Sequence, residues 1–82
     1  MIPSLVKNDL GNYRVLRGEA IVAFVVLMAD GSGWRVKSNT SARRNARVSQ
    51  ISPRKAFRAY FRNDAWAKPL IDQLPDDDYR LA

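Results

Sequence analysis

The residues best suited to chemistry lie in one continuous block, RVKSNTSARRNARVSQISPRKAFRAYFR, which spans residues 35–62. The block contains nine Lys or Arg and no acid, whereas the rest of the chain contains five cations and all eight acids. Arginine predominates, and its planar guanidinium matches phosphate or carboxylate in a two-pronged contact. The candidate binding residues are the nine cations Arg35, Lys37, Arg43, Arg44, Arg47, Arg54, Lys55, Arg58 and Arg62.

The segment SNTSARRNAR places Ser, Thr and Asn, which commonly contact phosphates, beside three of these arginines. Phosphate contacts supply most of the affinity with which proteins bind nucleic acid non-specifically. A plainer interpretation is that Arg54, Arg58 and Arg62 form only the solvated face of an amphipathic helix. Because that interpretation leaves the loop arginines unexplained, we expect a polyanionic partner, with nucleic acid favoured over an acidic protein surface.

The residue types needed for catalysis are scarce. The chain has no His and no Cys, so it lacks the commonest general base and any thiolate nucleophile or metal ligand. Carboxylates at Asp76, Asp77 and Asp78 suit a hard cation, but three acids near a chain end are typical of a solvated tail. We therefore expect no enzyme activity, no catalytic residue, no cofactor and no metal site. The lack of Cys fits a reducing, cytoplasmic setting.

Length and composition predict one small domain. A chain of 82 residues is too short for two domains, and a hydrophobic fraction of 46% argues against intrinsic disorder. The expected parts are an N-terminal segment (1–11), a β-meander (12–50), a helical part (53–74) and an acidic end (75–82).

The pattern between residues 13 and 51 predicts antiparallel strands. Apolar and polar residues alternate in YRVLR and WRVK, and between them AIVAFVVLMA (20–29) is an apolar run rich in β-branched residues. The run is about half the length that a helix needs to cross a bilayer. It ends in the turn DGSG, so a strand is favoured over a membrane span or a signal peptide. With ARVSQI (46–51) as a candidate fourth strand, the meander has three or four strands.

The segment SPRKAFRAYFRND predicts a helix at about residues 53–64. Ser52 is a favourable N-cap and Pro53 a favourable first residue, and the aromatic residues Phe57, Tyr60 and Phe61 recur on one face. A short second helix, with Pro69 near its start, is expected between the last two prolines. The fold class is therefore α+β, an antiparallel meander packed against one main C-terminal helix.

The apolar run predicts that both faces of its strand are buried, because a strand covered on one face should alternate. The main helix covers one face. The other needs the N-terminal segment, the Trp66–Leu74 region or a second copy of the chain, which makes a homodimer a serious alternative. The expected core residues are Val22, Phe24, Val26, Trp34, Val36, Phe57, Tyr60 and Phe61.

Geometry limits how many cations can share one surface. A helix that covers one face of the sheet turns its own arginines away from it, so strand and helix cations are expected on different sides. They can converge only at the edge formed by the loop at residues 40–47 and the helix start near Arg54. We predict the binding surface at that edge.

Strands followed by a helix reading SPRKAFRAYFR resemble the AP2-type DNA-binding domain and the arm-binding domains of tyrosine recombinases over roughly residues 34–62. The resemblance implies a sheet that enters the major groove, with the helix behind it. Two features depart from those families: Gly-rich strand ends are absent, and the second strand is wholly apolar.

A protein-binding module is the rival class of function. Small chains with uneven charge are common among phage accessory proteins, and some of these block host machinery, as anti-CRISPR proteins do. The basic block would then grip an acidic protein surface, or the acidic end would occupy a nucleic-acid channel. A subunit of a larger nucleoprotein assembly is a third alternative.

Overall fold

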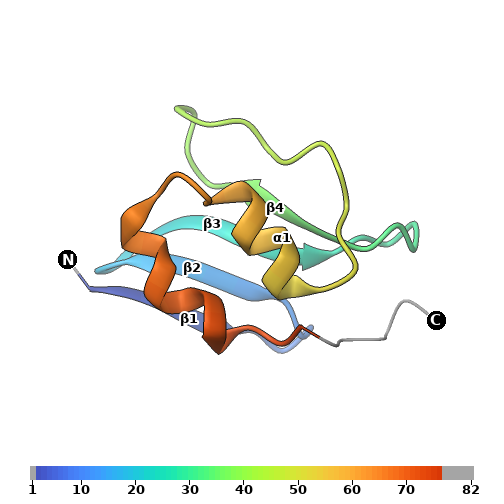
Figure 1. Ribbon diagram of the computed structural model, residues 1–82, viewed down its shortest axis with the longest axis horizontal. Coiled ribbons are helices and arrows are strands. Elements are labelled where there is room, and N and C mark those ends of the chain that lie inside the picture. The colour runs from blue at the N-terminus through green and yellow to red at the C-terminus, as the bar shows by residue number, and fades with distance from the viewer. Residues whose placement is uncertain (1, 77–82) are drawn as a thin grey trace.

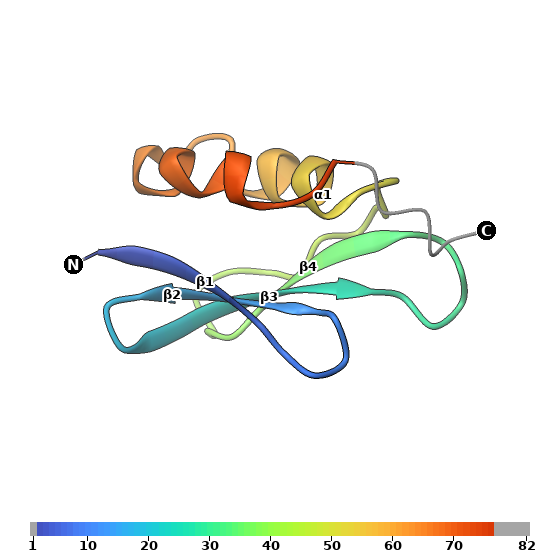
Figure 2. The same ribbon diagram turned by 90° about the horizontal axis from the view of Figure 1, so that it is seen from below.

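The computed structural model describes residues 2–76, and in it two helices pack on one face of a four-stranded antiparallel sheet (Figure 1). Viewed along the sheet, both helices lie on the same side, and no helix or strand of the described chain covers the opposite face (Figure 2). The predicted α+β fold is confirmed. No helix within residues 2–76 is long and apolar enough to cross a membrane. Residues 77–82 of the predicted acidic end lie outside the described range.

The strands follow one another in the sheet in chain order, as a meander does: β1 Pro3–Lys7, β2 Tyr13–Arg17, β3 Ala20–Leu27 and β4 Trp34–Ser38. One of these strands was not predicted: β1 lies within the N-terminal segment (1–11) that was expected to precede the meander. Its five residues contain only two large aliphatic side chains, too few to show an alternating pattern.

The predicted strand at 46–51 is wrong. That segment runs beside the free edge of β4, but it makes only one isolated bridge, between Trp34 and Gln50. The Ala46 N–H also donates to the Val36 carbonyl over 2.9 Å. Three residues of β4 (34–36) thus face five residues of the segment (46–50), so the residues between Ala46 and Gln50 bulge away and cannot form a regular ladder.

Helix α1 spans Pro53–Tyr60, shorter than the predicted 53–64, and Phe61 is its C-cap. Its start is as predicted: the Ser52 hydroxyl accepts from the Lys55 N–H over 3.1 Å, and Pro53 occupies the first turn. A turn then leads to the 3₁₀ helix η1, Ala65–Gln73, which has Pro69 in its interior rather than near its start. The helix tolerates Pro69 at this position because the chain here does not maintain regular α-helical hydrogen bonds.

The core lies between the sheet and the two helices. Trp34, Val36, Phe57 and Phe61 are buried as predicted, and Tyr60 is partly buried against them. Further buried residues come from β2, β3 and η1, namely Tyr13, Val15, Ala23, Val25, Leu70 and Leu74.

The predicted core face of β3 is wrong. Ala23 and Val25 are buried, whereas Val22, Phe24 and Val26 are only partly so, although Val22 packs against the core. An unbroken apolar run carries no alternation from which the inward face can be read. A shift in the pairing of β2 with β3, after Val15, also leaves Val22 without a partner in β2 and changes which residues of β3 face inward on either side of it.

Among the described helices and strands, none covers the second face of β3 (Figure 2). The Trp66–Leu74 region packs on the same side of the sheet as α1, contacting β1 and contributing Leu70 and Leu74 to the core. The N-terminal segment extends the sheet sideways as β1 instead of covering it. Of the three covers considered from the sequence, only a second copy of the chain is left, and it stays a prediction.

Candidate nucleic-acid interface

The loop that carries three of the candidate arginines, residues 39–50, is tied to β4 at both ends. The Gln50 N–H donates to the Trp34 carbonyl over 2.9 Å, and the Gln50 carbonyl accepts from the Trp34 N–H over 2.8 Å. Near the other end, the Asn45 side-chain oxygen accepts from the Ser38 N–H over 2.8 Å, and the Ser38 hydroxyl exchanges bonds with Thr40. Hydrogen bonds at both of its ends therefore hold this loop against the sheet.

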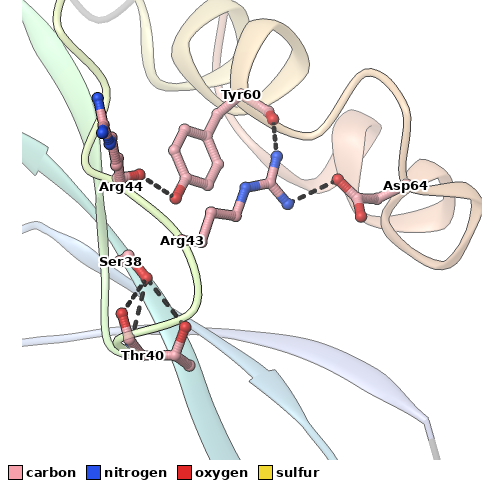
Figure 3. Close-up of polar contacts among 6 residues, drawn as sticks. All are labelled: Ser38, Thr40, Arg43, Arg44, Tyr60 and Asp64. Carbon is pink, nitrogen blue, oxygen red and sulfur yellow. Dashed lines mark hydrogen bonds and ion pairs between the residues drawn. The ribbon is translucent and has the colours of Figure 1, made fainter.

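Arg43 anchors the same loop to the C-terminal end of α1 (Figure 3). Its guanidinium donates to the Tyr60 carbonyl and forms an ion pair of 2.8 Å with Asp64. The same group lies 4.2 Å from the centre of the Tyr60 ring and 5.0 Å from that of Phe61, which are cation–π distances. Arg43 is thus occupied with holding the loop and is not a free binding residue.

Arg44 has the opposite arrangement. Its backbone carbonyl accepts a 2.6 Å hydrogen bond from the Tyr60 hydroxyl, while its side chain is directed away from Tyr60 and is exposed (Figure 3). The two neighbouring arginines therefore differ in role: the Arg43 side chain is structural, and the Arg44 side chain faces solvent on a fixed backbone.

A groove of about 420 Å³ separates the loop from α1. Buried Val36 and Ala56 lie at its base, beside the partly buried Tyr60. Two exposed arginines from different elements and three side-chain amides also line it: Arg47, Arg62, Asn45, Gln50 and Asn63. We call Arg44, Arg47, Arg62 and these three amide residues the loop–helix edge. Guanidinium and amide groups around a concave surface suit an anionic ligand with several oxygen acceptors.

The remaining helix cations lie at different distances from this edge. Lys55 and Arg58 are exposed on α1 and extend the positive surface along the helix. Arg54 is partly buried and donates to the Leu74 carbonyl over 2.9 Å, on the η1 side. The predicted meeting of the loop with the helix start near Arg54 is therefore wrong. The loop docks at the other end of α1, because Arg43 donates hydrogen bonds to the Tyr60 carbonyl and the Asp64 carboxylate there.

Asp76 lies beside the start of α1. Its carboxylate accepts from the buried Ser52 hydroxyl over 2.7 Å. This hydrogen bond, together with the nearby positive charges of Lys55, Arg54 and Arg58, lowers the pKa of Asp76 below the usual range for aspartate. The basic helix thus already attracts one carboxylate of its own chain.

Arg35 and Lys37 are separated from the other candidates. They alternate with the buried Trp34 and Val36 along β4, so they lie on the face of the sheet that the helices do not cover. The Arg35 guanidinium donates to the Ser49 hydroxyl over 2.7 Å and so touches the loop. The separation of strand and helix cations expected from the sequence is observed.

Some residues of the candidate interface carry no signal in the sequence. Gln50 and Asn63 carry no charge and lie in no motif, so only the docking of the loop beside α1 reveals them. Asn45 belongs to the segment SNTSARRNAR, whose Ser, Thr and Asn residues were expected to contact phosphates. Arg14 lies on the open face of the sheet, opposite Phe24. Strand alternation in YRVLR indicates this position, but Arg14 lies outside the basic block at residues 35–62.

Residues 2–76 contain no group of three or more His, Cys, Asp or Glu arranged to hold a metal ion. The chain matches no protein-family model, and no curated protein and no solved structure shows significant similarity to it. The resemblance to AP2-type and arm-binding domains therefore rests on the order of elements and on the helix sequence SPRKAFRAYFR alone.

Proposed function

We propose that this protein is a non-enzymatic module that binds nucleic acid through the loop–helix edge. The observation that carries the proposal is a concentration of cations without acids. Among the described residues, one ion pair is recorded, Arg43 with Asp64, and no acid lies within 4.0 Å of the other eight candidate cations. Positive charge held on a fixed surface and compensated only in part, by Asp76 near the start of α1, attracts a polyanion.

The shape of the edge supports the same proposal. Arg47 from the loop and Arg62 from beyond α1 line one groove, so they can contact neighbouring phosphates of the same backbone. The amides of Asn45 and Asn63 offer donors and acceptors to phosphate, sugar or base edges. A merely solvated helix face would not need a second, separately anchored element with the same charge.

A second candidate function is a protein-binding module, and one observation favours it. Val48 and Ile51, on the chain segment that borders the groove, leave 68% and 61% of their surfaces exposed. Arginine is enriched in protein interfaces, and the buried centre of an interface is more apolar than the rest of the protein surface. In this alternative the partner is an acidic protein surface.

The proposal is tested by removing the two groove arginines. We expect the double variant Arg47→Gln/Arg62→Gln to bind duplex DNA, single-stranded DNA and RNA more weakly, with the log–log salt dependence for duplex DNA flatter by about two units. The matched control is Lys7→Gln/Lys68→Gln, which removes two exposed cations outside this edge. It should leave the slope close to that of the wild-type protein.

Equal slopes in the two double variants would refute a specific role for the edge. The protein-partner alternative predicts a different result, little binding to random nucleic acid at about 150 mM salt. It also predicts a defined complex from a lysate that is lost in Val48→Ser/Ile51→Ser but retained in the control.

A further inference from the structure

The open face of the sheet has a composition that neither the core nor the loop–helix edge explains. The pairing of the strands places Val6, Arg14, Phe24 and Lys37 opposite one another, in a row across β1, β2, β3 and β4. Because Val15 and Val25 from the neighbouring rows are buried, this row points away from the helices. The Phe24 ring is partly exposed and is flanked by a cation on each side.

The rows on either side extend the same pattern. Val26 lies opposite Arg35, and Leu16 lies opposite Ile21. The face therefore consists of aliphatic residues around one aromatic ring, with three cations among them and no acid in any of the four strands. Phe24 takes part in none of the ring contacts recorded within residues 2–76.

Charge argues against a second copy of the chain as the cover of this face. Stacking two such faces would bring three cations of each copy against three of the other, with no strand acid to compensate them. Burying like charges together is strongly unfavourable. A partner with flat apolar groups and negative charge, in contrast, matches both components of the surface.

The apolar character also distinguishes between forms of nucleic acid. A duplex hides the faces of its bases in its own stack and presents phosphates and polar groove edges. A single strand exposes base faces, which stack on aromatic side chains while its phosphates contact cations. An aromatic ring between two cations fits the second form.

We propose that the open face binds single-stranded nucleic acid, with a base stacked on Phe24 and the flanking phosphates held by Arg14, Lys37 and Arg35. This inference rests on the proposed function and adds to it the class of strand and a second contact surface. Adjacent strands lie about 4.8 Å apart, so the backbones of Arg14 and Lys37 stand about 10 Å apart on either side of the ring. Arg35 also contacts Ser49, which connects this face to the loop beside it.

The test compares two substitutions of Phe24. Phe24→Leu keeps an apolar side chain but removes the ring, whereas Phe24→Tyr keeps the ring and serves as the matched control. We expect Phe24→Leu to weaken binding of an oligothymidylate of about 12 nucleotides by about 5- to 150-fold, the range for loss of one stacked base. Phe24→Tyr should stay within about twofold of the wild-type affinity. Thermal melts of both variants verify that the fold is intact.

Two further measurements separate this inference from the proposed function. Binding of a random duplex should be equal in all three proteins, because the loop–helix edge is unchanged. An oligonucleotide carrying 5-iodouracil should photo-crosslink to the peptide that contains Phe24. If the wild-type protein binds oligothymidylate and Phe24→Leu binds it equally well, this inference is wrong while the proposed function stands.

If the wild-type protein binds neither single strand nor duplex at about 50 mM salt, the proposed function falls and this inference falls with it. Light scattering, which measures the oligomeric state, tests the alternative that a second copy of the chain covers this face. A wild-type dimer that dissociates in Phe24→Leu would assign the open face to a second copy of the chain and overturn the inference.

Discussion

Separate substitutions of the adjacent residues Arg43 and Arg44 should have different effects, one on the stability of the fold and the other on the affinity for nucleic acid. Arg43→Gln removes the ion pair with Asp64, the bond to the Tyr60 carbonyl and the stacking on two rings. Arg44→Gln keeps the backbone carbonyl that Tyr60 contacts and removes only an exposed charge. We expect the first variant to lose stability and the second to lose affinity for nucleic acid.

The size of the Arg43 effect follows from its exposure. The side chains of Arg43 and Asp64 are 39% and 25% exposed, so solvent screens their attraction and the pair contributes about 0–1 kcal/mol. Cation–π contact at an exposed site adds about 0.5–1 kcal/mol. The free energy of unfolding should therefore fall by about 0.5–2 kcal/mol, which lowers the Tm of a domain of this size by about 2–16 °C.

Thermal denaturation followed by circular dichroism measures the first effect, and salt-dependent binding measures the second. Arg44→Gln should keep the wild-type Tm and flatten the duplex-DNA salt slope by about one unit, whereas Arg43→Gln should keep the slope. Asp64→Asn should reproduce part of the loss of stability, and the double variant with Arg43→Gln should lose less than the sum. A Tm unchanged by Arg43→Gln would refute the assignment of this residue as the anchor of the loop.

Other parts of the structure give further expectations. Phe57→Ala should lower the free energy of unfolding by about 3–5 kcal/mol, because this side chain of α1 is fully buried in the core. An unchanged midpoint in a urea titration would mean that the helix turns another face to the sheet. Gly33→Ala should strongly destabilise the fold, since φ is +128° there and a Cβ would overlap the Gln50 carbonyl oxygen; a native-like melt would contradict this geometry. Asp76 has a pKa lowered in the folded state, mainly by Ser52, so its stabilising effect is present above the unfolded pKa near 3.8 and is lost as the pH falls through the lower folded value. Asp76→Asn should therefore be less stable than the wild-type protein at pH 7, and the difference should shrink in melts below about pH 4.

The parts of the fold that sequence predicted are those with strong local signals. Ser52 and Pro53 fix where α1 begins, since the hydroxyl and the fixed proline φ act on neighbouring residues. Alternation in WRVK predicts Trp34 inside and Arg35 outside, because a strand whose register slipped by one residue would bury the charged side chains and expose the apolar ones. These assignments need no information about the rest of the chain.

The parts that sequence missed depend on tertiary contacts. Because β3 is uniformly apolar, no alternation of apolar and polar residues marks which of its faces points inward. That face is set by the pairing of β3 with β2 and by the space left beside Trp34 and Phe57. Likewise, the docking of the loop at the end of α1 depends on Arg43 meeting Tyr60 and Asp64. Charge in the sequence indicated which residues form a basic surface, but only packing shows which of them remain free to bind.

The measurement that tests the central claim most directly is the affinity of the wild-type protein for nucleic acid as a function of salt concentration. The exposed cations of the edge and of α1 are Arg44, Arg47, Lys55, Arg58 and Arg62. If between two and five of them contact phosphates of duplex DNA, the log–log slope lies between about −2 and −5. No detectable binding at about 50 mM salt, or an affinity independent of salt, would contradict the claim that this surface binds a polyanion.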